Sequence, residues 1–446
     1  MIRIYLMKTV QILKLAVAGV VFGVMTALLA PPATVNAAEP LSLGDAIERA
    51  LEENYSIRIR AREHEVAETN NSWGAAGRYP TIKFNLSGNT QYNFNEGPDV
   101  SSTSMAPGVA LNWVLFDGFA VTIRKERLDL FEALSSGNTT VLVESTVQSV
   151  IQAYYNTLFA RQKLNVLSDV RDLSRDRYDY MLNRQEIGHA VTYDVLQAKN
   201  AWLEDTSRYL QQEVTVRANM RDLAYLMGDD NAPDYQFTEA LEPPESNYLL
   251  EDLKERMLSG NSNLKNQYIG TLLLGEDVRL ARSDYLPTVS LSSGIDTPMS
   301  RSKTEGAPAT TREWQDIYAG FTLSLPLFDG GSRKRAVQVA HIEERIGGIE
   351  TENLRHSLVN QLDNLYDLYT VQQRLIEVAE ENLDAAKLNL SISDDRLRAG
   401  TITSFNYRDV QLIYLNASLA LLQEKLNIIN TNTALMKITG GILSEQ

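Results

Sequence analysis

The chain contains no cysteine among its 446 residues, so disulfide bonds, thiolate-bound metals and a lipid on an N-terminal cysteine are excluded. Histidine is scarce, and its four copies are scattered over helical stretches: His64, His189, His341 and His356. His341 opens a segment that lacks the second histidine of a zinc-protease helix, and no glycine-rich phosphate loop occurs. Carboxylate pairs are abundant, but they lie on charged helical faces where such residues are mostly solvated. We therefore predict no enzymatic activity, no metal site and no cofactor.

Long apolar runs are absent except near the N-terminus. Three basic residues precede an apolar run over 15–30, which is shorter than the roughly 20 residues that a membrane-spanning helix needs. Val35 and Ala37 then fit the small-residue positions of a cleavage site. We expect residues 1–37 to be a secretory signal peptide; the alternative is an uncleaved amphipathic anchor.

Acidic residues outnumber basic ones. The leader holds three of the 42 basic residues and none of the 57 acidic ones, so the rest of the chain has a net charge of −18. Because nucleic acid phosphates repel such a surface, we predict no nucleic acid partner.

One tetrapeptide is present twice. Leu-Phe-Asp-Gly at 115–118 returns at 327–330, an offset of 212 positions, and the same offset places Gly188 on Gly400. Near the start of each copy the offset is 207, so five residues were gained in a loop rich in Gly, Ser, Thr and Pro. A shared frame of glycines and apolar positions indicates a tandem duplication.

The repeated tetrapeptide is predicted to join a strand to a helix, because alternating apolar residues precede it and a helical pattern follows it. Asp117 and Asp329 can then accept hydrogen bonds from free backbone N–H groups as helix N-caps. Gly118 and Gly330 permit the sharp change of direction. We predict that these four residues form the two strand–helix junctions.

Each repeat is predicted to contain a helix, a β-hairpin, a long helix and a shorter helix. The first helix spans 41–78, and its second copy begins near Leu250. The hairpin strands are about ten residues long, a length that crosses a bilayer when the strand is tilted. The longer helices are expected at 119–186, 192–227, 332–398 and 404–439. The last of these carries a strict heptad of apolar residues, which indicates a coiled-coil seam or, alternatively, a helix buried in a globular core.

These patterns divide the chain into a first repeat at 38–228, a linker without secondary structure at 229–247, and a second repeat at 248–446. Four strands cannot close a barrel, and open sheet edges are not tolerated in hydrocarbon. We therefore predict an α+β membrane protein in which several chains pool their strands.

The export signal, the two repeats and the Leu-Phe-Asp-Gly motif at both second-strand ends together resemble the TolC family of bacterial outer-membrane efflux ducts. The family's fuller motif, Pro-x-Phe-Asp-Gly-Gly, is complete at 326–331, whereas the first copy has Val114 and Phe119 in place of the proline and the second glycine. The resemblance implies a homotrimer whose twelve strands form one β-barrel in outer-membrane lipid, on top of a long α-helical coiled-coil barrel in the periplasm.

The resemblance also implies a passive duct for efflux or type I secretion. Its partners would be a periplasmic adaptor, or membrane fusion protein, and an inner-membrane transporter of the RND, ABC or MFS type. In the family, the turn after each long helix is the periplasmic tip that contacts the adaptor. The matching tip residues here are Arg184, Gly188, Val191, Thr192, Arg396, Leu397, Gly400, Ile402 and Ser404.

Alignment on the tip glycines places the family's acidic gate positions at Asp194, Asn406 and Asp409. Asn406 departs from the family pattern, and so do Leu397 and Ile402, where the type member has its gate-locking tyrosine and arginine. Three copies of each aspartate near one axis predict a negative pore constriction that favours cations and binds divalent ions. The alternative is that both aspartates only complement the helix dipole.

The competing hypothesis for the whole chain is a secreted coiled-coil scaffold or adhesin without a pore. Aromatic residues at the strand ends favour the barrel, because such residues gather at membrane interfaces. They are Tyr79, Trp113, Phe116, Tyr285 and Phe328.

Overall fold

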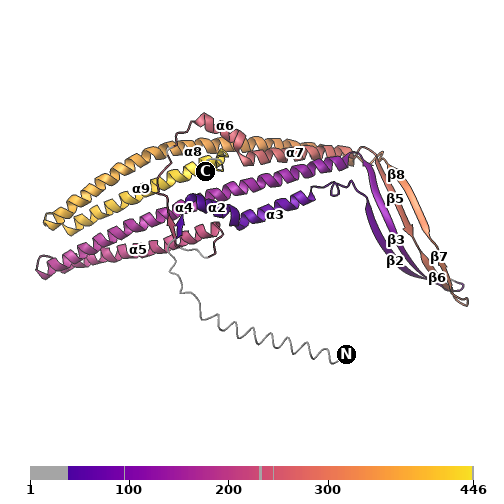
Figure 1. Cartoon of the computed structure of the whole chain (residues 1–446), viewed down its shortest axis with the longest axis horizontal. Helices are drawn as coiled ribbons and strands as arrows, with labels where there is room; N and C mark the ends of the chain where they lie inside the picture. Colours follow the sequence, from indigo (N-terminus) through magenta and orange to yellow (C-terminus); the bar gives the residue numbers. More distant parts are fainter. Residues whose placement is uncertain (1–38, 95, 231–233, 245, 444–446) are drawn as a thin grey trace, which may run out of the picture.

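Long helices form one part of the molecule and an antiparallel sheet forms the other, at one end of its long axis (Figure 1). The computed structural model describes residues 39–443 except 95, 231–233 and 245. The predicted signal peptide lies outside the described residues.

The four longer helices confirm the predicted positions to within about one residue. They are α4 (Ala120–Glu186), α5 (Thr192–Leu226), α8 (Ser332–Arg398) and α9 (Ser404–Ile438). In the half away from the sheet, α4 packs against α5 and α9, and α9 packs against α8. These four helices therefore form one layer in the order α5, α4, α9, α8, with α5 along one side and α8 along the other (Figure 1). Among the described residues, no helix is both long and apolar enough to cross a bilayer.

The prediction of one continuous helix at the start of each repeat is wrong. The first copy is divided into α2 (Leu43–Glu53) and α3 (Tyr55–Asn70), and the second into α6 (Leu250–Gly260) and α7 (Ser262–Ser283). An asparagine, Asn54 or Asn261, occupies each break and caps the helix that follows.

These asparagines also tie the break to a distant helix end. The Nδ2 of Asn54 donates to the carbonyl of Leu226 at 2.8 Å, and the Nδ2 of Asn261 donates to the carbonyl of Ile438 at 2.9 Å. Apolar periodicity continues across each break, so the sequence pattern did not reveal it. The capping side chain satisfies backbone groups that a continuous helix would have paired within itself.

The sheet contains six strands instead of the predicted four, because both strands of the second hairpin are interrupted. The strands are β2 (Thr81–Asn93), β3 (Val100–Asp117), β5 (Thr288–Asp296), β6 (Met299–Thr304), β7 (Thr310–Glu313) and β8 (Asp316–Ser324). β3 pairs with β2 on one side and with β5 and β6 on the other; β8 pairs with β5, and β7 with β6. The sheet therefore has four antiparallel runs, with β2 at one edge and β7 and β8 at the other (Figure 1).

The strand register separates an apolar face from a polar face. Phe84 lies opposite Val109, which lies opposite Ile295, whereas Asn85 lies opposite Gly108. Because successive side chains of a strand point to opposite faces, one side of the sheet is suited to lipid and the other to water.

We predicted that the segment between the repeats has no secondary structure, and this prediction is wrong. Within it, β4 (Tyr235–Phe237) forms a parallel pair with β1 (Glu39–Leu41). Tyr235 is fully buried in the largest core cluster together with Leu41 and Tyr154. The hydroxyl of Tyr154 donates to the carbonyl of Leu41 and to the carboxylate of Glu239. The linker thus packs onto the middle of α4.

Candidate functional site

Two helical turns lie at the end of the molecule away from the sheet (Figure 1). The first joins α4 to α5 through Gly188, and the second joins α8 to α9 through Gly400. These glycines have φ angles of 79° and 74°, the left-handed region that glycine adopts without strain. The N–H after each glycine donates back to the carbonyl of Arg184 or Arg396, at 2.7 Å and 2.9 Å. Both glycines therefore end a long helix as predicted.

The structure places most of the predicted docking residues at the surface of these turns. Arg184, Ile402 and Ser404 are half-buried, and the others, except one, are exposed: Gly188, Val191, Thr192, Arg396 and Gly400. The exception is Leu397, which is buried in a cluster with Met181, Val195, Ala198 and Tyr407. Its side chain therefore holds the two turns of one chain together and offers no surface to a partner.

Of the predicted constriction residues, Asp194 and Asn406 lie in the first turns of α5 and α9, and Asp409 lies one turn further along α9. Asp194 is half-buried, while Asn406 and Asp409 are exposed. The N–H of Asn406 donates to the hydroxyl of Thr403, the N-cap of α9, at 3.2 Å. Because Asn406 and Asp409 are three positions apart, they lie on the same side of the helix. The side chains of Asn406 and Asp409 are both accessible to solvent and are not part of the core of their own chain.

A buried ion pair joins the two helical hairpins just above the turns. Arg408 of α9 binds Asp205 of α5 with both ends of its guanidinium, Nη1 to Oδ2 at 2.6 Å and Nη2 to Oδ1 at 2.9 Å. Ser174 of α4 donates to the same Oδ2 at 2.5 Å and accepts from Arg408 at 3.1 Å. The side chains of Asp205 and Arg408 are only 2% and 12% exposed. Three helices are therefore locked together at one point.

The sequence analysis missed this pair, although one signal was present. Asp205 lies seven residues after Ala198 and seven before Gln212, and all three are buried. Heptad spacing of this kind places a residue in the seam between helices. A charged residue at such a position requires a partner, which the structure identifies as Arg408.

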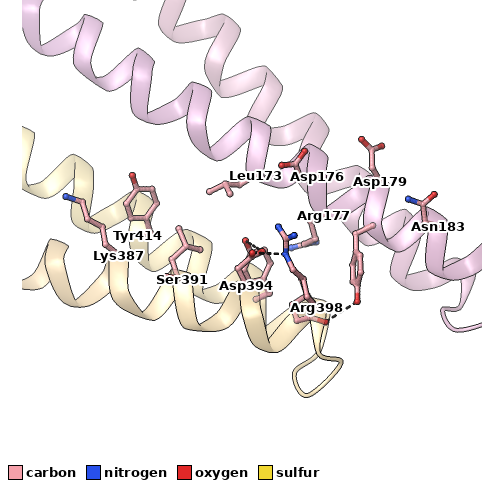
Figure 2. Close-up of a pocket in the computed structure, with 14 residues that line it drawn as sticks. Leu173, Asp176, Arg177, Asp179, Asn183, Lys387, Ser391, Asp394, Arg398 and Tyr414 are labelled. Carbon is pink, nitrogen blue, oxygen red and sulfur yellow. Dashed lines mark hydrogen bonds and ion pairs between the residues drawn. The ribbon is translucent and has the colours of Figure 1, made fainter.

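Arg177 of α4 lies beside this ion pair and is 4% exposed. Burial, together with the positive charge of Arg408, lowers the pKa of Arg177 to about 10. Its Nε and Nη1 have no hydrogen-bond partner among the described residues. It lines a cavity of about 730 Å³ between α4 and the α8–α9 hairpin (Figure 2).

On the other side of this cavity, Asp394 accepts hydrogen bonds from Arg398 Nε at 2.9 Å and from the hydroxyl of Tyr407 at 3.3 Å. Burial, with the negative charge of Asp394, raises the pKa of Tyr407 to about 12, so this hydroxyl stays protonated and donates. Tyr180 of α4 reaches across and donates to the carbonyl of Leu397 at 3.1 Å. The two turns are thus connected within one chain.

The two strand–helix junctions use their aspartates as predicted, but not as N-cap residues. Asp117 accepts from the N–H of Val121 at 3.1 Å, and Asp329 accepts from the N–H of Arg333 at 2.9 Å. The N-cap positions themselves are two residues later, at Phe119 and Gly331, both with left-handed φ angles. The hydrogen bond from the Arg333 backbone keeps the pKa of Asp329 below its usual value.

The sequence of residues 46–229 and 254–441 matches the sequence model of a protein family described as "Outer membrane efflux protein". Among individual proteins, CyaE of Bordetella pertussis is 26% identical over 326 residues, which are 70% of this chain and 65% of that protein. The chain thus spans less than two thirds of the length of CyaE. The alkaline protease secretion protein AprF of Pseudomonas aeruginosa is 22% identical over 91% of this chain and 85% of its own length.

The solved structure of the CmeC outer membrane channel of Campylobacter jejuni has the same fold. It superimposes with a TM-score of 0.75 at 16% identity, covering 91% of this chain and 87% of that chain.

Proposed function

This chain belongs to the outer membrane efflux protein family, and we propose that it works as a homotrimer whose three copies enclose one continuous duct. It is located in the outer membrane with a long periplasmic extension, where it is the channel of an efflux or type I secretion system. Members of this family are passive channels and not enzymes.

The observation that carries the proposal is a row of exposed apolar side chains on both outer helices of the layer. On α8 the row repeats at spacings of three and four: Leu368, Val371, Leu375 and Val378. On α5 it repeats every seven residues: Leu196, Leu203 and Leu210. All of these side chains are more than a third exposed, although their spacing is that of a coiled-coil seam.

Such a seam is stabilised only when a second helix covers it, because burial contributes about 25 cal/mol for each Å² of apolar surface. Since α5 and α8 lie on opposite sides of the layer, α8 of one copy can cover α5 of the next. This head-to-tail contact generates a ring when the rotation closes. The same arrangement extends toward the sheet, where α3 exposes Tyr55, Ile59 and Val66 beside the seam.

The sheet supports the same assembly. Among the described residues, β2 pairs only with β3 and β8 only with β5, so each of these two strands has one unpaired edge. Every residue of both strands is exposed. Lipid offers no hydrogen bonds to such edges, which must therefore be paired with other strands. Because β2 and β8 run in opposite directions, joining them keeps the whole ring antiparallel. Three copies with four runs each give a closed barrel of twelve.

We further propose that the helical turns form the periplasmic end. Three copies would bring Asp194 and Asp409 around one axis as a negative constriction. The exposed turn residues, Val191 and Arg396 among them, would contact a periplasmic adaptor coupled to an inner-membrane transporter of the RND, ABC or MFS class. The Asp205–Arg408 pair supports this assignment, because it holds both turns at the same level within each copy.

The test is to extract the protein from the outer-membrane fraction with detergent, measure its mass by light scattering, and reconstitute it in planar bilayers. We expect a mass of three chains and discrete conductance steps. A water-soluble monomer that is inert in bilayers would contradict the proposal and indicate a scaffold or adhesin.

A further inference from the structure

One buried cation at the helical end has donors that the chain does not use. Arg177 of α4 is 4% exposed, and its Nε and Nη1 make no hydrogen bond within the part of the chain that the structure describes. These two nitrogens carry three N–H donors. Buried donors are almost always paired, because an unpaired one loses its hydration without compensation. The free donors of Arg177 therefore point to an acceptor that is not part of this chain.

The buried groups around Arg177 carry one positive charge in excess. Burial, and then the charge of Arg408, lower the pKa of Arg177, while Asp205 and Tyr407 act in the opposite direction. Asp205 is already bound at both of its oxygens by Arg408. Two guanidinium groups thus share one buried carboxylate. An anion beside Arg177 would accept its hydrogen bonds and also balance this charge, whereas a water molecule would do only the first.

The carboxylates that line the cavity do not balance Arg177. Asp394 of α8 accepts a hydrogen bond from Arg398 at 2.9 Å, so its charge is already paired. Asp176 and Asp179 of α4 are exposed to solvent. Figure 2 shows Asp179 pointing away from the α8–α9 hairpin, whereas Arg177 points toward it. The guanidinium therefore faces the cavity with its charge uncompensated.

The other walls of the cavity are largely aromatic and apolar. They include the rings of Tyr180 and Tyr414 and the side chains of Leu173 and Leu390. The volume of about 730 Å³ lies within the range of about 300 to 1,000 Å³ that is usual for small-molecule sites, which combine apolar walls with a few polar groups. An organic anion fits such walls better than an inorganic one, because its apolar part can be buried while its charge meets Arg177.

We propose that this cavity binds a small organic anion, whose carboxylate or phosphate group accepts hydrogen bonds from Arg177 and whose apolar part lies against Tyr180 and Tyr414. The site is formed by α4, α8 and α9 of a single chain, so it does not depend on the proposed trimer. An occupant would contact both helical hairpins close to the turns.

The test is isothermal titration calorimetry on the full protein in a non-ionic detergent at neutral pH. The probes are benzoate, its neutral analogue benzamide, and inorganic phosphate, which has the charge without the ring. We expect benzoate to bind about tenfold more tightly than benzamide, because hydrogen bonds between charged groups are the stronger kind. Phosphate should bind more weakly than benzoate, because it buries no apolar surface.

Two arginine variants locate the site. Arg177→Gln should lower the affinity for benzoate about tenfold and leave the affinity for benzamide unchanged. Arg175→Gln is the matched control, because it removes an exposed arginine from the same stretch of α4 and should change neither affinity. Circular dichroism of both variants checks that the helices are retained.

Undiminished benzoate binding by Arg177→Gln, or an equal loss in Arg175→Gln, would overturn the proposed site. Equal binding of benzoate and benzamide by the native protein would overturn it as well, and this comparison decides the question even where Arg177→Gln fails to fold. Phosphate binding more tightly than benzoate would overturn the organic part of the proposal. None of these outcomes bears on the proposed channel, which the mass and the conductance test separately.

Discussion

At the helical end of the molecule, Arg408 reaches a buried carboxylate of its own chain and Leu397 packs into an internal cluster. At the sheet end, Phe328 and Gly330 contact nothing comparable, and two strands have unpaired edges. The helical turns are therefore positioned by contacts within one chain, whereas the sheet has free edges that the proposed trimer would pair.

The first prediction concerns the helical end, where Asp205 and Arg408 form a buried ion pair within one chain. Replacing Asp205 with alanine leaves Arg408 and the adjacent Arg177 buried together without a counter-charge, which should cost about 3 to 5 kcal/mol of unfolding free energy. Urea unfolding followed by circular dichroism measures the loss. The control is Asp172→Ala, which removes an exposed carboxylate paired with the half-buried Arg171 and should cost at most about 1 kcal/mol. Equal unfolding midpoints for the two variants would show that the buried pair does not hold the hairpins together.

The second prediction concerns the sheet end, which the proposed trimer would complete. Leu86→Lys places a charge on the apolar face of the sheet and should cost about 2 to 4 kcal/mol near the middle of the hydrocarbon layer. Ser87→Lys, on the polar face, is the matched control and should be close to neutral. The measurement is the temperature at which trimers dissociate on semi-native gels. Equal dissociation temperatures would mean that the apolar face does not meet lipid.

The third prediction concerns two carboxylates near the turns, the half-buried Asp194 and the exposed Asp409. Removing both with Asp194→Ala and Asp409→Ala should lower the preference of the channel for K⁺ over Cl⁻ about fivefold, which corresponds to roughly 1 kcal/mol. Charges that solvent reaches are screened at physiological salt, so the effect should grow as salt is lowered. Reversal potentials in asymmetric KCl measure it. An unchanged ion preference would show that these aspartates only complement their helix dipoles.

The smallest effect is expected midway between the two ends. Glu144 of α4 is buried and accepts a hydrogen bond from Ser262 at 2.6 Å, and burial raises its pKa although Ser262 and Lys437 act in the opposite direction. A carboxyl whose pKa is raised on folding stabilises the fold below its unfolded value of 4.5, and this contribution is lost as the pH rises through the higher folded value.

Glu144→Gln should therefore flatten the pH dependence of unfolding free energy above pH 4.5. Urea titrations at several pH values measure this, with Glu52→Gln, an exposed residue, as the control. A profile in which Glu144→Gln still loses stability from pH 4.5 upward would assign the titration to another group.

Much of the fold could be predicted from local pattern. The long helices begin and end at the predicted residues, because proline is absent from them and glycine follows both α4 and α8 closely. The junction aspartates accept backbone N–H groups as expected, since a strand-to-helix turn always leaves such groups free. The breaks at Asn54 and Asn261 were missed, because their cause is a hydrogen bond to a helix end more than 170 residues away.

The order of residues along the chain was enough to establish the duplication, the succession of elements and the two-faced strands, because these depend on residues close together in sequence. Three-dimensional packing was needed to show that Asp205 pairs with Arg408, that Leu397 faces inward, and that one copy of the Leu-Phe-Asp-Gly motif is covered while the other is open. Burial and charge pairing are properties of neighbours in space. Residues that are identical in sequence therefore acquire different environments when one repeat lies inside the sheet and the other at its edge.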